Sequence, residues 1–157
     1  QVQPYPASGT QPSKEHYVAA GLFPSDQWVR IQVIRQDILG DVGVELRASD
    51  TNDTMYVPIV NLTGGPGTAM TRIVSVLNGS PTPLVVDQQW SAVSEGDYVR
   101  GQVQGNLISL INETTGALLL AVVDNAISSG GYPGISLGED ANPADHVGAN
   151  WSAGDFQ

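Results

Sequence analysis

Acidic side chains are the first residues in this sequence that could perform chemistry, because Asp and Glu make up 16 of the 157 residues. Glycoside hydrolysis uses two carboxyl groups that face one cleft, about 5 to 5.5 Å apart for retention and about 6.5 to 9.5 Å apart for inversion. The only two acids separated by a single residue are Glu95 and Asp97. They come just before an apolar alternation at residues 98–103, so they are more typical of a solvated turn than of a catalytic pair.

Other catalytic patterns are also missing from the sequence. There is no Cys, which excludes disulfides, thiolate metal sites and a Cys nucleophile. The two histidines, His16 and His146, lie far apart and neither stands at metal-ligand spacing. Residues 64–67 read Gly-Gly-Pro-Gly but lack the Lys of a phosphate-binding loop. We therefore expect a protein that is not an enzyme.

Calcium is the one metal that the sequence leaves open, because Ca²⁺ binds several carboxylate and carbonyl oxygens from loops. The stretch 138–148 is acidic, and its candidate ligands are Asp140, Asn142 and Asp145. A second, weaker group lies in residues 49–53. Neither group has the spacing of an EF-hand, and an acidic loop in solvent is the ordinary explanation. The sequence therefore predicts no cofactor, with Ca²⁺ as the single alternative.

Aromatic side chains beside polar ones could bind a carbohydrate, since an aromatic ring offers an apolar face near hydrogen-bonding groups. Trp28 shares a predicted strand face with Arg30 and Gln32, which indicates an exposed ring. The candidates for sugar contact are Trp28, Trp90 and Trp151. Packing in the core or at a strand end is the more common role for such rings. Trp151 also lies inside an Asn-Trp-Ser glycosylation acceptor, where it could pack under a glycan.

The charge balance excludes several partners. Six basic residues face 16 acidic ones, and the net charge of -10 would repel a nucleic-acid backbone or an anionic membrane surface. No stretch approaches the roughly 20 consecutive apolar residues of a membrane-spanning helix. We expect neither nucleic-acid binding nor membrane insertion.

Acceptors for N-glycosylation are more frequent than chance predicts. The acceptor is Asn-x-Ser/Thr, and eight Asn with 22 Ser or Thr in 157 residues predict about one. The sequence has five, at Asn52, Asn61, Asn78, Asn112 and Asn150. Shared use of Asn and Thr in turns accounts for part of this excess. We interpret the rest as a sign of a secreted, glycosylated protein at the cell surface, and a first residue of Gln fits processing on export.

Apolar residues alternate with a period of two, which predicts β-strands, and no window of helical length has a sustained 3.6-residue period. Predicted strands cover 27–35, 42–49, 55–60, 71–77, 82–87, 97–103, 106–111 and 117–124, with turn formers between them. This pattern predicts an all-β fold, an antiparallel β-sandwich of the jelly-roll type with an extended N-terminal arm.

Three details of this prediction concern single elements. Residues 117–123 are apolar at every position, so we expect a central strand covered on both faces. Pro58 cannot donate to a ladder, which places its strand at an edge or a bulge. On the strand at 42–49, Val44 and Leu46 point inward, while Glu45 and Arg47 point outward.

Residues 96–138 resemble the second half of a concanavalin A-like (laminin-G-like) jelly roll. There a Gly-Asp turn leads into a hairpin, then a strand ending in Asp, then a turn and strand of the form Gly-Gly-Tyr-Pro-Gly-Ile. Residues 23–33 and 41–57 are similar to the earlier strands of that family, and its outward arginine corresponds to Arg47. The resemblance covers roughly residues 21–156 and implies the fold rather than one activity, because such domains include lectin-like modules, glycan hydrolases and structural units. The related hydrolases carry Glu-x-Asp-x-Glu on one strand, and this sequence lacks it.

The N-terminal arm is where the sequence departs from that family, which has further strands before the segment that starts at residue 23. We predict an arm at 1–15, a sandwich at 16–157 and one sheet that lacks a strand. Pro4 and Pro6 remove backbone donors from one side of the extended arm only. The residues predicted to pair with another sheet are Val2, Gln3, Tyr5 and Ala7.

Two functions from different classes follow from these observations. In the first, the chain is a structural subunit of an extracellular filament, in which each arm adds a strand to the next copy head-to-tail. In the second, the chain is a lectin-like module that binds carbohydrates without catalysis. The partners predicted are therefore copies of the chain itself or glycans.

Overall fold

The structure is a computed structural model that describes residues 13–16, 22–36, 41–61, 70–86, 92–137 and 146–156. Within these ranges every regular element is a strand, as the period-two pattern predicts. The strands are β1 (Ser13–His16), β2 (Gln27–Gln36), β3 (Asp41–Ala48), β4 (Met55–Asn61), β5 (Met70–Leu77), β6 (Ser80–Val86), β7 (Tyr98–Gln104), β8 (Leu107–Asn112), β9 (Ala117–Val123), β10 (Tyr132–Leu137) and β11 (His146–Asp155). No helix in the described ranges is long and apolar enough to cross a membrane.

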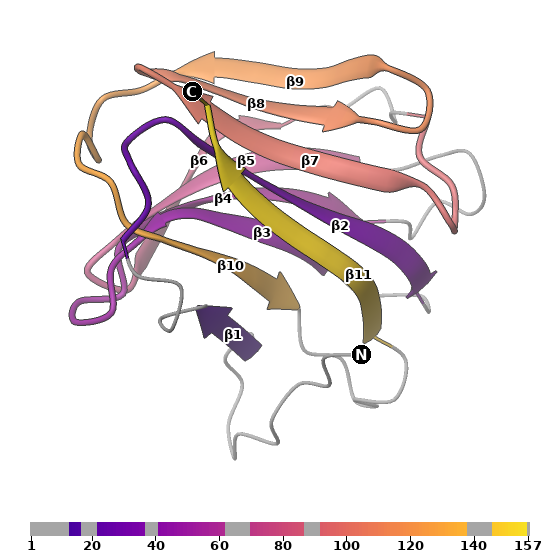
Figure 1. Ribbon diagram of the computed structural model, residues 1–157, viewed down its shortest axis with the longest axis horizontal. Coiled ribbons are helices and arrows are strands. Elements are labelled where there is room, and N and C mark those ends of the chain that lie inside the picture. The colour runs from indigo at the N-terminus through magenta and orange to yellow at the C-terminus, as the bar shows by residue number, and fades with distance from the viewer. Residues whose placement is uncertain are drawn as a thin grey trace.

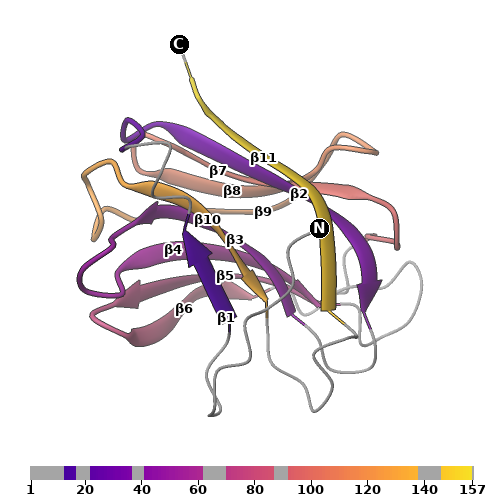
Figure 2. The same cartoon turned by 60° about the horizontal axis from the view of Figure 1, so that its bottom comes forward.

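The strands form two antiparallel sheets that pack face to face (Figures 1 and 2). One sheet has six strands in the order β1-β10-β3-β4-β5-β6, and the other has five in the order β11-β2-β7-β8-β9. Strands distant in sequence, such as β3 and β10, are neighbours, so the chain crosses repeatedly between the two layers. The predicted all-β, jelly-roll sandwich is confirmed.

The main core lies between the two sheets and comes from alternate residues of each strand. Val29, Ile31 and Val33 of β2 are completely buried, as their spacing predicts. Gly101 of β7 allows close approach, because a Cβ there would lie 2.4 Å from Cγ2 of Val44 in the opposite sheet. Burial of this apolar surface is the main favourable contribution to folding.

Pro58 predicts an edge strand or a bulge, and this prediction is wrong. β4 lies inside the six-stranded sheet, between β3 and β5. Its pairing with β5 is continuous, with Pro58 opposite Ile73. Its pairing with β3 is interrupted between the pairs Gly43↔Ile59 and Leu46↔Tyr56. The missing donor of Pro58 is therefore accommodated as a local gap in one ladder.

The prediction that residues 117–123 form a central strand is also wrong, because β9 is an edge strand of the five-stranded sheet. Leu119, Leu120 and Val122 pack against the core, whereas 63% of Leu118 and 64% of Val123 is exposed. β9 is thus apolar on both faces, but only the face toward the core is buried.

Two strands have no sequence prediction behind them. β11 contains Gly148 and Gly154 and lacks clear alternation, but it pairs with β2 along its length with two register shifts. β1 overlaps the end of the predicted arm and pairs with β10 of the same chain, at the edge of the six-stranded sheet. The first part of the arm, including Val2, Gln3, Tyr5 and Ala7, lies outside the described residues.

Candidate functional site

Loops from three parts of the sequence meet at one end of the sandwich. Figure 1 shows the indigo segment before β2 and the orange segment after β9 at the same end, next to the turn between β7 and β8. Antiparallel pairing brings these connections together, because the start of β2 and the ends of β7 and β9 lie on the same side. Arg47, near the end of β3, reaches all three loops.

Arg47 is the residue that ties this end of the sandwich together. Its Nε donates to the carbonyl of Ser25 at 2.7 Å, its Nη2 donates to the carbonyl of Gly105 at 2.6 Å, and its Nη1 donates to the carbonyl of Ile127. The side chain is 2% exposed. The prediction that Arg47 points outward is therefore wrong: the side chain reaches the β7–β8 turn of the opposite sheet and is buried under the loops. Glu45, predicted to point outward, is likewise fully buried.

The backbone of Arg47 has a positive φ of 53°, in the left-handed region. Long side chains rarely adopt this conformation, which costs about 1 to 3 kcal/mol and persists only where other contacts offset the cost. Here the fully buried Gln27 fixes it, since its Oε1 accepts from the Arg47 backbone N–H at 3.0 Å. Gln27 of β2 thus holds the strained backbone of β3 in place, and this conformation directs the guanidinium toward the loops.

Burial lowers the pKa of Arg47 from its ordinary value, while the nearby Tyr56 and Asp26 act in the opposite direction. Asp26 Oδ1 lies 3.9 Å from Nη2 of Arg47 and accepts from the Gly105 backbone N–H at 2.8 Å. Because an arginine loses its proton only at very high pH, the guanidinium stays charged. The site therefore keeps a buried positive charge with one carboxylate at its rim.

Tyr56 supports the same loops from below. Its hydroxyl donates to Asp124 Oδ1 at 2.6 Å and accepts from the Ile127 backbone N–H at 2.9 Å. Burial and the hydrogen bond to Asp124 raise the pKa of Tyr56 to about 12. Asp124 Oδ1 also accepts from the Ala126 N–H at 2.9 Å, so this carboxylate holds the start of the loop rather than facing solvent.

Above these residues lies the loop-end pocket, a cavity of about 270 Å³. Its lining residues are Ser25, Arg47, Gly105, Asn106, Asn125 and Ser128. The volume is close to the lower end of the range typical of small-molecule sites. Within the described residues, the lining combines two hydroxyls and two amides with a guanidinium and contains no carboxylate.

The chemistry of this lining suits a neutral, polyhydroxylated ligand. Asn106 and Asn125 are exposed and each offers both donors and an acceptor, and the Ser hydroxyls can do either. A metal ion would want several carboxylates, and no group of three His, Cys, Asp or Glu side chains lies close together in the described ranges. The two nearest acids, Asp26 and Asp124, already accept hydrogen bonds from the protein. Among the described residues, the pocket thus presents hydrogen-bonding groups with which it could bind a ligand.

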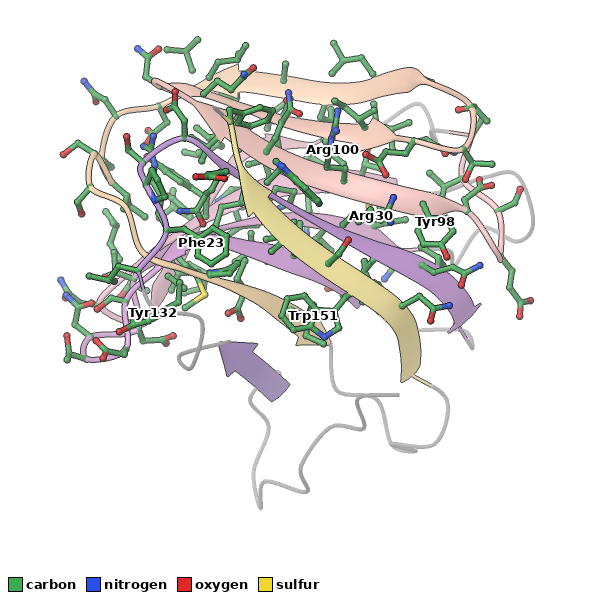
Figure 3. All side chains as sticks on the ribbon, viewed as in Figure 1. Phe23, Arg30, Tyr98, Arg100, Tyr132 and Trp151 are labelled. Carbon is green, nitrogen blue, oxygen red and sulfur yellow. The ribbon has the colours of Figure 1, made fainter. Side chains whose placement is uncertain are left out.

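The outer face of the five-stranded sheet carries a second polar cluster, but its groups bind one another. Figure 3 shows Arg30, Tyr98 and Arg100 together over β2 and β7. Glu113 lies 3.0 Å from Arg100 and 3.5 Å from Arg30, whose guanidinium stacks over the Tyr98 ring at 5.2 Å. Arg30 also donates to Ser152 at 2.8 Å. Since these charges and this ring face are already engaged, the cluster offers less to a ligand than the loop-end pocket does.

Neither Trp28 nor Trp151, the two predicted sugar-contact tryptophans that the structure describes, lines the loop-end pocket. The indole of Trp28 lies over β11, where a Cβ on Gly154 would come within 2.7 Å of Cζ2. Trp151 is partly buried and packs against the main core. Trp90 lies outside the described residues. The rings that are described stabilise the sandwich at β11.

The predicted glycosylation acceptors differ sharply in their surroundings. Asn52 and Asn78 are exposed in neighbouring turns, whereas Asn112 is fully buried. The Asn112 amide donates to Ala92 O at 3.1 Å and to Asp97 Oδ2 at 2.9 Å, and its Oδ1 accepts from the Thr114 N–H. The other two acceptors have amides that donate within the protein: Asn61 to Asp41, and Asn150 to Gln32.

The remaining predicted site residues are placed as follows. Asp97 accepts from Asn112 and from the Ser94 N–H at 2.9 Å, which agrees with a turn role for the Glu95–Asp97 pair. The calcium candidates Asp140, Asn142 and Asp145 lie outside the described residues. The pocket residues themselves have only weak sequence signals, namely the Gly105-Asn106 turn and the Asp124-Asn125 step after an apolar strand.

The two antiparallel sheets form a jelly-roll sandwich, and solved structures share this fold. The carbohydrate-binding module CBM66 from Bacillus subtilis matches with a TM-score of 0.62 and 13% identity, over 82% of this chain and 74% of that one. Chicken galectin 2 matches with a TM-score of 0.60 and 6% identity, over 90% and 97%. The complex of toad ovary galectin with thio-digalactose matches with a TM-score of 0.61 and 11% identity, over 93% and 100%.

Such low identities establish a common fold and nothing finer. Neither a protein-family model nor a curated protein matches the sequence. Beyond the shared fold, the resemblance to the concanavalin A-like (laminin-G-like) family stays a prediction, because the structures named above are galectins and a carbohydrate-binding module.

Proposed function

We propose that this protein is a carbohydrate-binding module without catalytic activity, and that it holds one neutral sugar ring in the loop-end pocket. The observation that carries the proposal is the lining of that pocket: hydroxyls, amides and a guanidinium in a cavity of about 270 Å³, with no carboxylate. The shared fold supports it, since proteins of this architecture are described as galectins and as a carbohydrate-binding module. Fold likeness alone would not suffice.

The contacts of the pocket residues indicate that they have two different roles. Arg47 donates three hydrogen bonds to loop carbonyls, and these bonds fix the shape of the pocket before a ligand binds. Preorganisation of this kind reduces the ordering cost of binding. Asn106 and Asn125 are exposed, so their amides are free to meet ring hydroxyls. Sugar selectivity would then depend on how many of these amide groups a given stereoisomer satisfies.

The experiment starts with a glycan array probed with protein made in a bacterial host, which adds no N-glycans. The best monosaccharide is then titrated calorimetrically into wild type and into Asn125→Ala. We expect about a tenfold loss of affinity, since one hydrogen-bonding pair contributes about 1 to 1.5 kcal/mol. Asn52→Ala is the matched control, because Asn52 is an exposed asparagine in a turn that does not line the pocket.

Three results decide the matter. Binding that Asn125→Ala weakens and Asn52→Ala leaves intact supports both the function and the site. Binding that neither change affects refutes the pocket as the site. No binding on an array that includes neutral hexoses and pentoses refutes the function.

An extracellular location remains a proposal that rests on the five acceptors in the sequence. Assembly into a filament by strand donation also remains a proposal, and it depends on Val2, Gln3, Tyr5 and Ala7. Deletion of residues 1–12 tests it: an unchanged assembly state on light scattering would count against donation.

A further inference from the structure

The free edge of β9 is the largest feature that the proposed pocket leaves unexplained. β9 pairs only with β8, so within the described ranges its other edge carries backbone N–H and C=O groups with no strand beside them. The edge is 7 residues long, or about 24 Å at 3.4 Å per residue. An open edge of this length is a template for pairing with another chain.

The three other sheet edges carry features that oppose pairing. β6 contains Pro81 and Pro83, which lack backbone donors. β1 is 4 residues long and includes Lys14 and Glu15. β11 pairs with β2 through two register shifts, and its ladder is irregular. β9 has no proline, no glycine and no charged residue, and its pairing with β8 contains a single register shift, at Leu119.

The surface beside this edge is apolar and uncharged. The exposed fractions are 63% for Leu118, 64% for Val123 and 42% for Leu107 on the neighbouring β8. Neither β8 nor β9 contains a charged residue, although the chain has a net charge of -10. Because both copies are acidic, most of their surfaces would repel each other. Contact through β8 and β9 buries no charged side chain.

The backbone pattern shows which groups of β9 point away from β8. The Asp124 N–H donates to Asn106 O at 2.9 Å, and the register continues with Val122 opposite Ile108. In an antiparallel pair, hydrogen-bonded residues alternate with residues that turn their groups to the other side. Val122 therefore bonds toward β8, and Ala121 and Val123 direct their N–H and C=O groups to the open edge.

We propose that β9 pairs antiparallel with β9 of a second copy, about a two-fold axis at Ala121. An antiparallel edge is complementary to itself, so two identical strands satisfy each other's donors and acceptors in an isologous contact. The small side chain of Ala121 lets the strands approach at the axis. Val123 comes beside Leu119 of the other copy, the residue that the register shift in β9 leaves without a partner on β8. The two five-stranded sheets become one continuous sheet. An isologous contact uses the same surface of both copies and leaves none for a third. Pairing through β9 therefore yields a dimer and does not continue into a filament.

Sedimentation velocity over a concentration series tests the proposal with Ala121→Lys. This change adds a charge at an exposed position on the two-fold axis and leaves the bonds to β8 intact. We expect wild type to approach twice the monomer mass as concentration rises. Ala121→Lys should stay monomeric and keep the thermal midpoint that wild type has at low concentration, where wild type is also monomeric. The control is Thr82→Lys, the same type of change on the exposed β6 edge, which should still dimerise. A monomeric wild type, or a dimer that survives Ala121→Lys, overturns the proposal.

Hydrogen exchange on the wild type gives a second measurement that needs no variant. The amides of Ala121 and Val123 should exchange slowly only at concentrations where the dimer forms. The amide of Val122, bonded to β8, should be protected at every concentration. Equal exchange at Ala121 across the dimer transition would place the interface elsewhere and refute the pairing.

The dimer and the carbohydrate site can fail separately. The pocket lies at one end of the sandwich and β9 at a sheet edge, so monomeric Ala121→Lys should bind a free monosaccharide as wild type does. Only binding to a multivalent glycan surface should weaken, through lost avidity.

Discussion

Arg47→Ala is the change that tests most directly how the loop end is built. The substitution removes the guanidinium that binds the carbonyls of Ser25, Gly105 and Ile127. Hydrogen bonds to a charged group contribute about 1.5 to 3 kcal/mol each. Water can replace the lost partner at the exposed Ser25 and Gly105, so their bonds count at the low end. We expect the free energy of unfolding to fall by about 3 to 5 kcal/mol, as for other buried charged groups removed from their partners.

Arg47→Gly separates the side-chain bonds from the backbone strain. Both variants lose the guanidinium, but glycine adopts the positive φ of 53° without the clash that a Cβ causes. Glycine elsewhere in a strand costs about 0.5 to 1 kcal/mol relative to alanine. Relief of about 1 to 2 kcal/mol of strain reverses that order. We expect Arg47→Gly to be more stable than Arg47→Ala by about 0.5 to 1 kcal/mol.

Urea unfolding followed by tryptophan fluorescence measures both differences, with Arg30→Ala as the control. Arg30 also binds a carboxylate, but its side chain is 44% exposed and such pairs contribute about 0 to 1 kcal/mol. An Arg47→Ala variant as stable as Arg30→Ala would refute the role of Arg47 in holding the loops. An Arg47→Gly variant less stable than Arg47→Ala would refute the claim of backbone strain.

Three further predictions concern other parts of the fold. The raised pKa of Tyr56, about 12, means that the unfolded chain ionises first, so its contribution to stability is complete below about pH 10 and is lost between pH 10 and 12. In alkaline urea titrations that loss should disappear in Tyr56→Phe, and its persistence would exclude this group as the cause. Gly101→Ala should lower the unfolding free energy by about 1 to 3 kcal/mol, because the new Cβ lies 2.4 Å from a valine of the opposite sheet; an unchanged urea midpoint would contradict the tight approach. Peptide mapping after expression in a glycosylating host should find Asn52 and Asn78 occupied and the buried Asn112 bare, so a glycan on Asn112 would contradict its burial.

Period-two alternation was sufficient to predict most strands and the face that each buries. Val29, Ile31 and Val33 face the core because side chains alternate along a strand wherever the sheet lies. The turn-forming residues between the strands can also be recognised from short stretches of sequence. The same holds for the residue spacings of catalytic motifs, which the sequence lacks. These properties depend on neighbouring residues only, which is why the sequence alone determines them.

Strand order was decided only by the tertiary structure, because alternation does not say which strands are neighbours. β9 lies at an edge despite its apolar sequence, and Pro58 lies in a central strand because one interrupted ladder absorbs its missing donor. β11 has weak strand signals of its own and is held by pairing with β2.

The candidate site is likewise a product of the fold. Asn106 and Asn125 stand in different turns, and Arg47 comes from a third part of the chain. None of them belongs to a recognisable motif in the sequence, and alternation predicts only that Arg47 points outward. The crossing connections of the jelly roll bring them together, and burial under the loops turns Arg47 from a surface charge into the group that holds the pocket in shape. The sequence by itself thus determined the kind of fold, and long-range packing determined which residues line the candidate site.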